Sequence, residues 1–304
     1  MAEQFGKVGI IGLGALGILF GSNLLAMGAD VRILCDEERA GRYRREGVTC
    51  NGKPVGFRYM TPSEAEPMDL VIFATKFGGL SAAMETAAGF IGGSTLLLSV
   101  LNGISSEQLL AERFGREKVI WCTAQGMDAV KEGNALSFAH PGMIVLGEEK
   151  PGNVSERASA LADWLTAHGV HAEAVPDMLR RQWGKLMLNV GVNQVVMVWK
   201  GTYGTVQVPG EARDTMLAAM RETQQLAGLE GYPIPDAEYD AWVALCDSLS
   251  PEGMPSMRQD GLAGRASEVE LFAGTIIREA KKFGLPVPVN EMLYERVKQA
   301  EAAY

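Results

Sequence analysis

The sequence is poor in the residues that build metal centres and disulfide frameworks. Its 304 residues include only four cysteines and three histidines, and no two cysteines are spaced as C-x-x-C. This scarcity excludes a zinc site of the usual spacing and a fold stapled by disulfides. We expect no bound metal and interpret the cysteines as buried thiols of a reducing compartment. They are Cys35, Cys50, Cys122 and Cys246.

Long apolar runs and an excess of positive charge are also missing. No stretch approaches ~20 uninterrupted apolar residues, the length that crosses a bilayer. The first residues, MAEQFGK, carry an acid where a signal peptide has its basic region. The formal net charge of −9 disfavours nucleic acid and anionic membrane surfaces as partners. We therefore expect a cytoplasmic protein whose ligands are small molecules.

Apolar residues make up 47% of the chain against 21% charged residues, and the length is sufficient for two domains. The stretch KVGIIGLGALGILFGSNLLAMGADVRILCD organises the first half. It predicts a strand over Val8–Ile11 and a helix over Ala15–Met27, with a G-x-G-x-x-G between them. In such a loop the first glycine permits a tight turn, the second lets a pyrophosphate approach the backbone, and the third lets helix and strand pack closely. The predicted phosphate-binding loop comprises Gly12, Leu13, Gly14, Ala15, Leu16 and Gly17.

An acidic residue completes this dinucleotide fingerprint. A second predicted strand, Asp30–Leu34, is followed by Asp36, about 20 residues beyond the glycines, where a carboxylate hydrogen-bonds the ribose of the cofactor. The alternative is a glycine-rich turn that packs well and holds no ligand. Because strand, loop, helix, second strand and acid are all present, the pattern favours a nicotinamide dinucleotide.

Two continuous apolar runs, Asp69–Thr75 and Ser94–Leu101, predict further strands, each followed by a helical segment. Strands that alternate with helices indicate a parallel sheet, and right-handed crossovers bring the carboxyl ends of its strands to the side of the glycine loop. Lys76 and Asn102 each follow such a strand end, so we expect both to face the cofactor. Taken singly, Lys76 is also typical of a solvated loop lysine, and Asn102 is more typical of a turn former before glycine; their matching positions at strand ends favour the cofactor.

Later segments extend this sheet. Val119–Gly126 and Leu136–Gly147 are predicted strands, followed by a helix over Ser155–His168 and a last strand over Val170–Val175. His140 lies in a loop between apolar stretches. We expect a structural role for it and do not predict that it is catalytic.

The second half of the sequence is predicted to be almost entirely helical. A long helix from about Asp177 carries Lys185, Asn189 and Asn193 at intervals of four residues, which places three polar side chains on one stripe of an otherwise apolar helix. Burying a lysine or an amide without a partner is costly. The stripe therefore indicates either a ligand-binding cleft or a hydrogen-bond network between helices, with Lys185 extended to solvent.

Two segments beyond this helix are predicted loops, Gly201–Gly210 and Pro251–Asp260, and a further helix is predicted over Ala266–Phe283. Glu268 falls in the first turn of that helix, where a carboxylate interacts favourably with the helix dipole.

Several short motifs occur together along essentially the whole chain. They are GLGALG, Thr75-Lys76, Leu101-Asn102-Gly103, Trp183-Gly184-Lys185-Leu186 followed by Asn189 and Asn193, Pro255-Ser256-Met257, Glu268-Val269-Glu270 and GLPVPVN. In this combination the sequence resembles the ketopantoate reductases (2-dehydropantoate 2-reductases). The Lys-x-x-x-Asn-x-x-x-Asn stripe with the downstream Ser-Met and Glu is far more specific than the glycine loop.

The resemblance implies a role for each matched residue. The glycine loop would hold the pyrophosphate, Lys185 would be the proton donor, and Glu268 would touch the reacting centre from the cofactor side. The residues implied to face the cofactor are Lys76, Asn102 and Gly126. Those implied to bind the substrate are Asn102, Asn189, Asn193 and Ser256.

Two positions depart from the family pattern. Asp36 stands where many relatives carry an arginine for the 2′-phosphate of NADPH, the family's usual cofactor. A carboxylate there favours a free ribose hydroxyl, so we expect NADH to serve at least as well as NADPH, although Arg39 or Arg42 could reach a phosphate. Tyr203 stands where some members place a substrate-binding asparagine. The expected substrate is therefore a branched 2-keto acid, with ketopantoate as the first candidate.

The sequence predicts an α/β fold with two domains: a Rossmann-type, doubly wound parallel sheet over residues 1–175 and an all-helical substrate-binding and catalytic domain over residues 176–304, with the active site in the cleft between them. The expected function is NAD(P)H-dependent reduction of ketopantoate to pantoate, a step of pantothenate and coenzyme A biosynthesis. The alternatives are a related 2-keto or 3-hydroxy acid dehydrogenase and a non-catalytic sensor that binds NAD(P). The apolar C-terminal helices are compatible with a homodimer interface or with a core.

Overall fold

The computed structural model describes residues 5–303. It divides into a first unit that ends at Met178 and a second that begins at Leu179. Within the described residues every helix is too short or too polar to span a bilayer. In the same part of the chain, His, Cys, Asp and Glu side chains form no group of three or more that could hold a metal ion.

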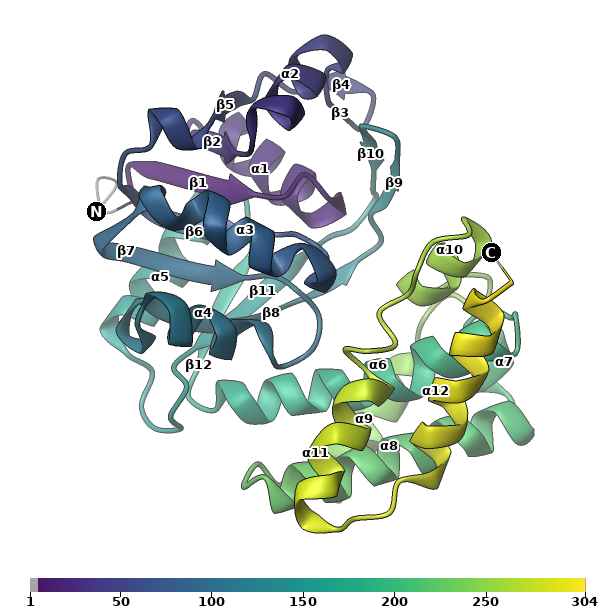
Figure 1. The fold of residues 1–304 in the computed structure, drawn as a ribbon. Helices are drawn as coiled ribbons and strands as arrows, with labels where there is room; N and C mark the ends of the chain where they lie inside the picture. Colours follow the sequence, from purple (N-terminus) through teal and green to yellow (C-terminus); the bar gives the residue numbers. More distant parts are fainter. Residues whose placement is uncertain (1–4, 304) are drawn as a thin grey trace. The chain divides into compact units, whose positions relative to one another are not determined.

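One eight-stranded sheet forms the centre of the first unit (Figure 1). Across the sheet its strands are β12 (Ala172–Val175), β11 (Pro141–Gly147), β8 (Val119–Met127), β7 (Ile91–Ser99), β6 (Met68–Phe73), β1 (Lys7–Ile11), β2 (Asp30–Leu34) and β5 (Arg58–Met60). Neighbours pair in parallel except β8 and β11, which are antiparallel. From β1 the sheet grows in both directions, toward β2 and toward β6, which confirms the doubly wound fold.

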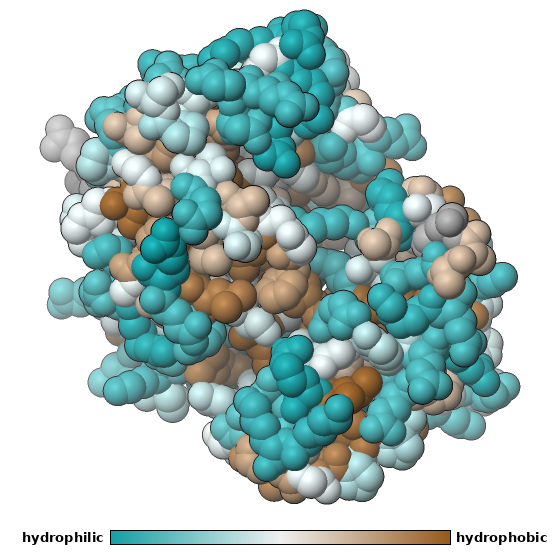
Figure 2. Space-filling model, viewed as in Figure 1, coloured by the Kyte–Doolittle hydropathy of each residue, from teal (hydrophilic) through white to brown (hydrophobic). Residues whose placement is uncertain are grey.

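The helices of this unit connect the strands. They are α1 (Ala15–Ala26), α2 (Glu37–Glu46), α3 (Leu80–Ala87), α4 (Ser106–Phe114) and α5 (Glu156–Ala167). In Figure 1, α3 and α4 lie in front of the sheet. Helix α2 buries only Ala40 and Tyr43, and Figure 2 shows the hydrophilic surface that lies over it.

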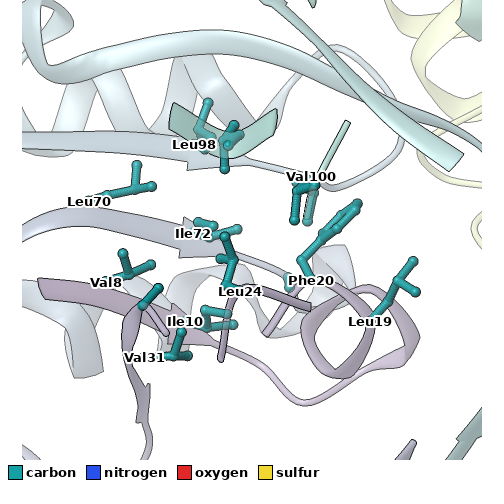
Figure 3. Packing of buried hydrophobic residues seen from close by; sticks show 14 of the residues in the cluster. Val8, Ile10, Leu19, Phe20, Leu24, Val31, Leu70, Ile72, Leu98 and Val100 are labelled. Carbon is teal, nitrogen blue, oxygen red and sulfur yellow. The ribbon is translucent and has the colours of Figure 1, made fainter. Parts of the chain in front are cut away.

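The main core of the first unit lies between the sheet and α1 and α5. In Figure 3 the side chains of Phe20 and Leu24 of α1 lie among apolar side chains of β1, β2, β6 and β7. All four cysteines are buried and free, which confirms their interpretation as buried thiols. Burial raises the pKa of the Cys35 and Cys246 thiols to about 11.

A second, four-stranded sheet lies beside the main one in the first unit. Its strands in order are β4 (Lys53–Pro54), β3 (Thr49–Cys50), β10 (Ala135–Ser137) and β9 (Val130–Glu132). The predicted strand over Leu136–Gly147 was therefore wrong, because two strands in different sheets replace it. The Asp128 carboxylate accepts hydrogen bonds from the backbone N–H groups of Ala139 and His140 at 2.9 and 2.7 Å. These bonds turn the chain between β10 and β11.

The second unit is all helical. Its helices are α6 (Met178–Val198), α7 (Gly204–Gln207), α8 (Glu211–Leu229), α9 (Asp236–Asp247), α10 (Ser256–Leu262), α11 (Ala273–Phe283) and α12 (Pro288–Glu301). Two glycines let α6 approach its neighbours closely. A Cβ at Gly184 would lie 2.5 Å from Nε1 of Trp242 on α9, and one at Gly191 would lie 3.0 Å from the backbone oxygen of Met216 on α8.

Three predictions for this unit were wrong. The segment Gly201–Gly210, expected as a loop, contains α7, and the segment Pro251–Asp260, expected as a loop, overlaps the start of α10, with Pro255 at its N-cap position. The helix expected from Ala266 begins only at Ala273, after turns that include Glu268. The buried side chain of Gln194 on α6 accepts a hydrogen bond from the Ala273 N–H at 3.2 Å. This tertiary contact fixes the start of α11.

Candidate active site

Each glycine of the loop between β1 and α1 has a steric reason in the structure. Gly12 has φ +99°, and a Cβ there would lie 2.8 Å from the backbone oxygen of Ala74, just beyond β6. A Cβ at Gly14 would lie 3.2 Å from the same oxygen. A Cβ at Gly17 would lie 1.9 Å from the backbone oxygen of Gly12. The third glycine is therefore the one that lets α1 start directly against the loop.

This loop fits the phosphates of a dinucleotide. Among the described residues, no side chain caps the N-terminus of α1 at Gly14, and the first turn of α1 holds no acidic residue. The positive end of the helix dipole is thus open to an anion. Beside the loop, Thr75 Oγ1 is buried with no hydrogen-bond partner in the described part of the chain, and Thr75 Cγ2 would lie 2.7 Å from a Cβ at Gly12. A bound phosphate or ribose oxygen can satisfy such a hydroxyl.

Asp36 follows β2 and caps α2. One carboxylate oxygen accepts a hydrogen bond from the Arg39 N–H at 2.7 Å, and the other contacts the Arg39 guanidinium. The side chains of Asp36 and Arg39 are 45% and 57% exposed. An exposed ion pair of this kind contributes only about 0.2–1 kcal/mol, so the carboxylate remains available to a ribose.

The residues predicted to face the cofactor follow parallel strands of one sheet. Lys76 is exposed and follows β6, and Asn102 is half-buried in the turn after β7. Gly126 lies near the end of β8 with φ +77°. Because β6, β7 and β8 are parallel, their carboxyl ends lie at the same edge as the glycine loop. The cofactor contacts themselves remain predictions.

Gly126 lies opposite a second glycine that the sequence interpretation missed. Gly142 has φ +64°, and a Cβ there would lie 2.3 Å from the backbone oxygen of Gln125. The signal was the His140-Pro141-Gly142 triplet, whose turn character predicts a special backbone conformation but gives no partner.

The polar stripe of the second unit lies on one helix, as predicted. Lys185, Asn189 and Asn193 all belong to α6, where a four-residue step corresponds to about 6 Å along the axis. Lys185 and Asn189 are half-buried, and Asn193 is 7% exposed. Most other positions of α6 are buried and apolar, although Gln182 and Gln194 are also buried, so the stripe lies on a helix that is otherwise largely core.

The other predicted residues of the second unit lie on its short connecting segments. The Tyr203 N–H donates to the Gly253 backbone oxygen at 2.9 Å, and the Tyr203 ring packs so closely on Gly253 that a Cβ there would lie 3.0 Å from the ring. Ser256 is exposed at the start of α10, and Glu268 lies in the turn before α11. The structure thus brings Tyr203 beside the segment that leads to Ser256. Burial raises the pKa of Tyr203 to about 12, so its hydroxyl stays protonated at neutral pH.

Comparison with known proteins identifies similar chains over nearly the full length. A family model described as "Ketopantoate reductase PanE/ApbA" matches residues 8–151, and one described as "Ketopantoate reductase PanE/ApbA C terminal" matches residues 177–301. The 2-dehydropantoate 2-reductase of Archaeoglobus fulgidus is 27% identical over 97% of this chain and 98% of its own.

Solved structures share the fold. The 2-dehydropantoate 2-reductase of Geobacter metallireducens is 27% identical, with a TM-score of 0.86 over 97% of this chain and 99% of that chain. A D-mandelate dehydrogenase bound to NADH and anilino(oxo)acetate is 24% identical, with a TM-score of 0.87 over 98% of both chains. The same fold is thus shared by a protein named 2-dehydropantoate 2-reductase and by one named D-mandelate dehydrogenase.

Proposed function

The chain belongs to the ketopantoate reductase family of NAD(P)-dependent oxidoreductases, and on this premise we propose that it reduces 2-dehydropantoate (ketopantoate) to pantoate. The observation that carries the proposal is the stripe of Lys185, Asn189 and Asn193 on the single helix α6. A sensor that binds NAD(P) without catalysis has no use for an amine and two amides in this arrangement.

We propose that the two units bind different ligands. Residues 1–175 bind the dinucleotide through the glycine loop and the strand ends around it. Residues 176–304 bind the keto acid and supply the proton. The open N-terminus of α1 and the buried hydroxyl of Thr75 support the first assignment, and the polar side of α6 supports the second.

A nicotinamide dinucleotide held by the glycine loop would supply a hydride to the C2 carbonyl carbon of the keto acid. Lys185 hydrogen-bonds the carbonyl oxygen, stabilises the negative charge that grows on it and then transfers a proton to it. Asn189 and Asn193 offer neutral donors and acceptors that hold the carboxylate or hydroxyl of the substrate. Ser256 adds a hydroxyl, and Glu268 contacts the reacting centre from the cofactor side. Asn193 is the one buried member of this group, and hydrogen bonds that it makes to the substrate gain most from the exclusion of bulk water.

We propose that NADH serves at least as well as NADPH. Asp36 supports this, because its carboxylate accepts hydrogen bonds from a 2′-hydroxyl and repels a 2′-phosphate. The Arg39 guanidinium is already paired with the Asp36 carboxylate. It therefore weakens the repulsion between this carboxylate and a 2′-phosphate, while the carboxylate oxygens can still accept hydrogen bonds from a 2′-hydroxyl.

Tyr203 supports a substrate with an apolar branch. Its hydroxyl is neutral at physiological pH, and its ring is fixed against Gly253. A rigid aromatic face suits methyl groups better than an amide does. Ketopantoate carries two methyl groups next to its ketone, and other branched 2-keto acids share this feature.

The test is a spectrophotometric assay of purified protein with ketopantoate, with NADH and NADPH compared in parallel. Oxidation of either cofactor that depends on ketopantoate supports the proposal. If the protein binds cofactor and turns over only other 2-keto acids, the oxidoreductase assignment stands and ketopantoate is the wrong substrate.

We also propose a homodimer formed through the second unit. The exposed apolar side chains on this unit support it, and they include Leu229, Leu245, Leu262 and Phe283. Light scattering on the purified protein distinguishes a dimer from a monomer.

A further inference from the structure

The helix that follows the Asn102 turn carries a buried carboxyl group in its first turn. Glu107 is in the first turn of α4 and is only 1% exposed. Burying a carboxyl group is costly, and an apolar side chain would fill the same space without that cost. The neighbours of Glu107 show what it does there.

Both oxygens of Glu107 accept hydrogen bonds. Ser106 Oγ donates to Oε2 at 2.8 Å, and the Cys122 N–H donates to Oε1 at 3.4 Å. The position in the first turn of α4 adds the favourable end of the helix dipole. Glu107 therefore joins α4 to β8 from below the turn.

The network continues to the end of β7. Ser99 Oγ donates to Ser106 Oγ at 2.7 Å and accepts from the Leu101 N–H at 3.5 Å. The Cys122 thiol donates to the Ser99 backbone oxygen at 2.9 Å. Ser99, Ser106 and Cys122 are all at most 1% exposed. These hydrogen bonds connect Glu107 to the backbone of Leu101 through Ser106 and Ser99. Leu101 is the residue immediately before Asn102.

On one side of β7 the sheet reaches the base of this turn, where Phe73 of β6 pairs with Ser99 and accepts a hydrogen bond from the Val100 N–H at 2.9 Å. On the other side the pairing ends earlier. Strands β7 and β8 pair through Leu97 with Val119 and Leu98 with Ile120. Beyond that point Glu107 takes the Cys122 N–H, so a side chain continues the connection where the strand ladder ends.

We propose that Glu107 is a positioning residue that holds the turn carrying Asn102 in place for the cofactor. The proposal rests on the proposed function and on the contacts of Asn102 with cofactor and substrate that the family resemblance implies. Glu107 touches neither and acts through Ser99, Ser106 and Cys122.

The variant Glu107→Gln tests the acceptor role with little change in shape. An amide has one acceptor oxygen and two N–H donors, so it cannot accept from both Ser106 and Cys122 and presents a donor to one of them. We expect the dissociation constant for NADH, measured by fluorescence, to rise. We expect kcat/KM to fall by roughly 10- to 100-fold, because a contact group displaced by about 1 Å has an effect of this size. Glu112→Gln on the exposed side of the same helix is the matched control and should leave both values unchanged.

A double-mutant cycle with Asn102→Ala separates positioning from general destabilisation. If Glu107 acts through the Asn102 turn, Glu107→Gln has little further effect on NADH affinity once Asn102 is truncated. Equal losses in both backgrounds, or a lowered melting temperature with unchanged NADH affinity, overturn the proposal. Ser106→Ala, which removes the link between Ser99 and Glu107, repeats the cycle if Glu107→Gln does not fold. NADH binding needs no turnover, so a wild-type protein that binds NADH but reduces no keto acid contradicts the proposed function alone and leaves this test in force.

Discussion

Replacing Asp36 with asparagine should change which nicotinamide cofactor the protein prefers while leaving its stability nearly unchanged. Asp36 caps α2 through the Arg39 N–H, and in the proposed function its carboxylate also binds the adenosine ribose. Asparagine caps a helix as well as aspartate does. The loss of the exposed ion pair with Arg39 removes only about 0.2–1 kcal/mol.

The effect on the cofactor follows from the charge. The Asp36 side chain is 45% exposed, so a dielectric close to that of water applies, and two unit charges at about 4 Å repel by about 1 kcal/mol. A 2′-phosphate carries a charge of about −1.5 to −2. Asp36→Asn should therefore raise the ratio of kcat/KM for NADPH to that for NADH by roughly 10- to 30-fold, since 1.4 kcal/mol corresponds to a factor of ten.

Initial rates at several concentrations of each cofactor, with the keto acid saturating, give this ratio. Glu38→Gln is the matched control, because it removes the same charge from an exposed site in the first turn of the same helix and should change the ratio far less. The reasoning is refuted if Asp36→Asn leaves the ratio unchanged, or if the wild-type protein already prefers NADPH strongly.

Three further predictions test other parts of the structure. Lys185→Ala should lower kcat by about 10²- to 10⁴-fold with little change in the dissociation constant for NADH; near-normal turnover would remove Lys185 from the mechanism. Gly17→Ala should lower the free energy of unfolding by at least about 1–3 kcal/mol, because the added Cβ would overlap the Gly12 backbone oxygen. Urea unfolding measures this loss. The control is Gly41→Ala, whose added Cβ would lie 3.5 Å from the flexible end of Arg45 and should leave the free energy of unfolding unchanged or raise it. Burial raises the pKa of Tyr203 from 10.0 to about 12, so the unfolded chain releases this proton first and the free energy of unfolding should fall between pH 10 and pH 12. That fall should be smaller in Tyr203→Phe, and an equal fall in both proteins would contradict the assignment.

The parts of the fold that depend on local pattern were predictable from the sequence. The glycine loop, the apolar strand runs and the capped helices of the first unit all carry their signals within a few residues. The Lys185 stripe was predictable for the same reason, because a four-residue spacing fixes a helix face wherever the helix packs.

The errors lie where a distant residue decides the local structure. The start of α11 depends on Gln194, which is 79 positions away. The break between β10 and β11 depends on the carboxylate of Asp128. The role of Glu107 was invisible for the same reason, since a glutamate in the first turn of a helix is typical of an exposed acid and only the structure shows that it is buried.

The two glycines of α6 have a consequence for the accuracy of the site. Gly184 and Gly191 are seven residues apart, so they lie on the same side of the helix, and Lys185, Asn189 and Asn193 lie roughly 100–180° around its axis. On the glycine side the backbone of α6 rests almost directly on Trp242 and Met216, with no long side chain between them to act as a spring. Close contact of the α6 backbone with α8 and α9 thus resists sliding of the helix, and it sets the height at which Lys185, Asn189 and Asn193 stand on the opposite side.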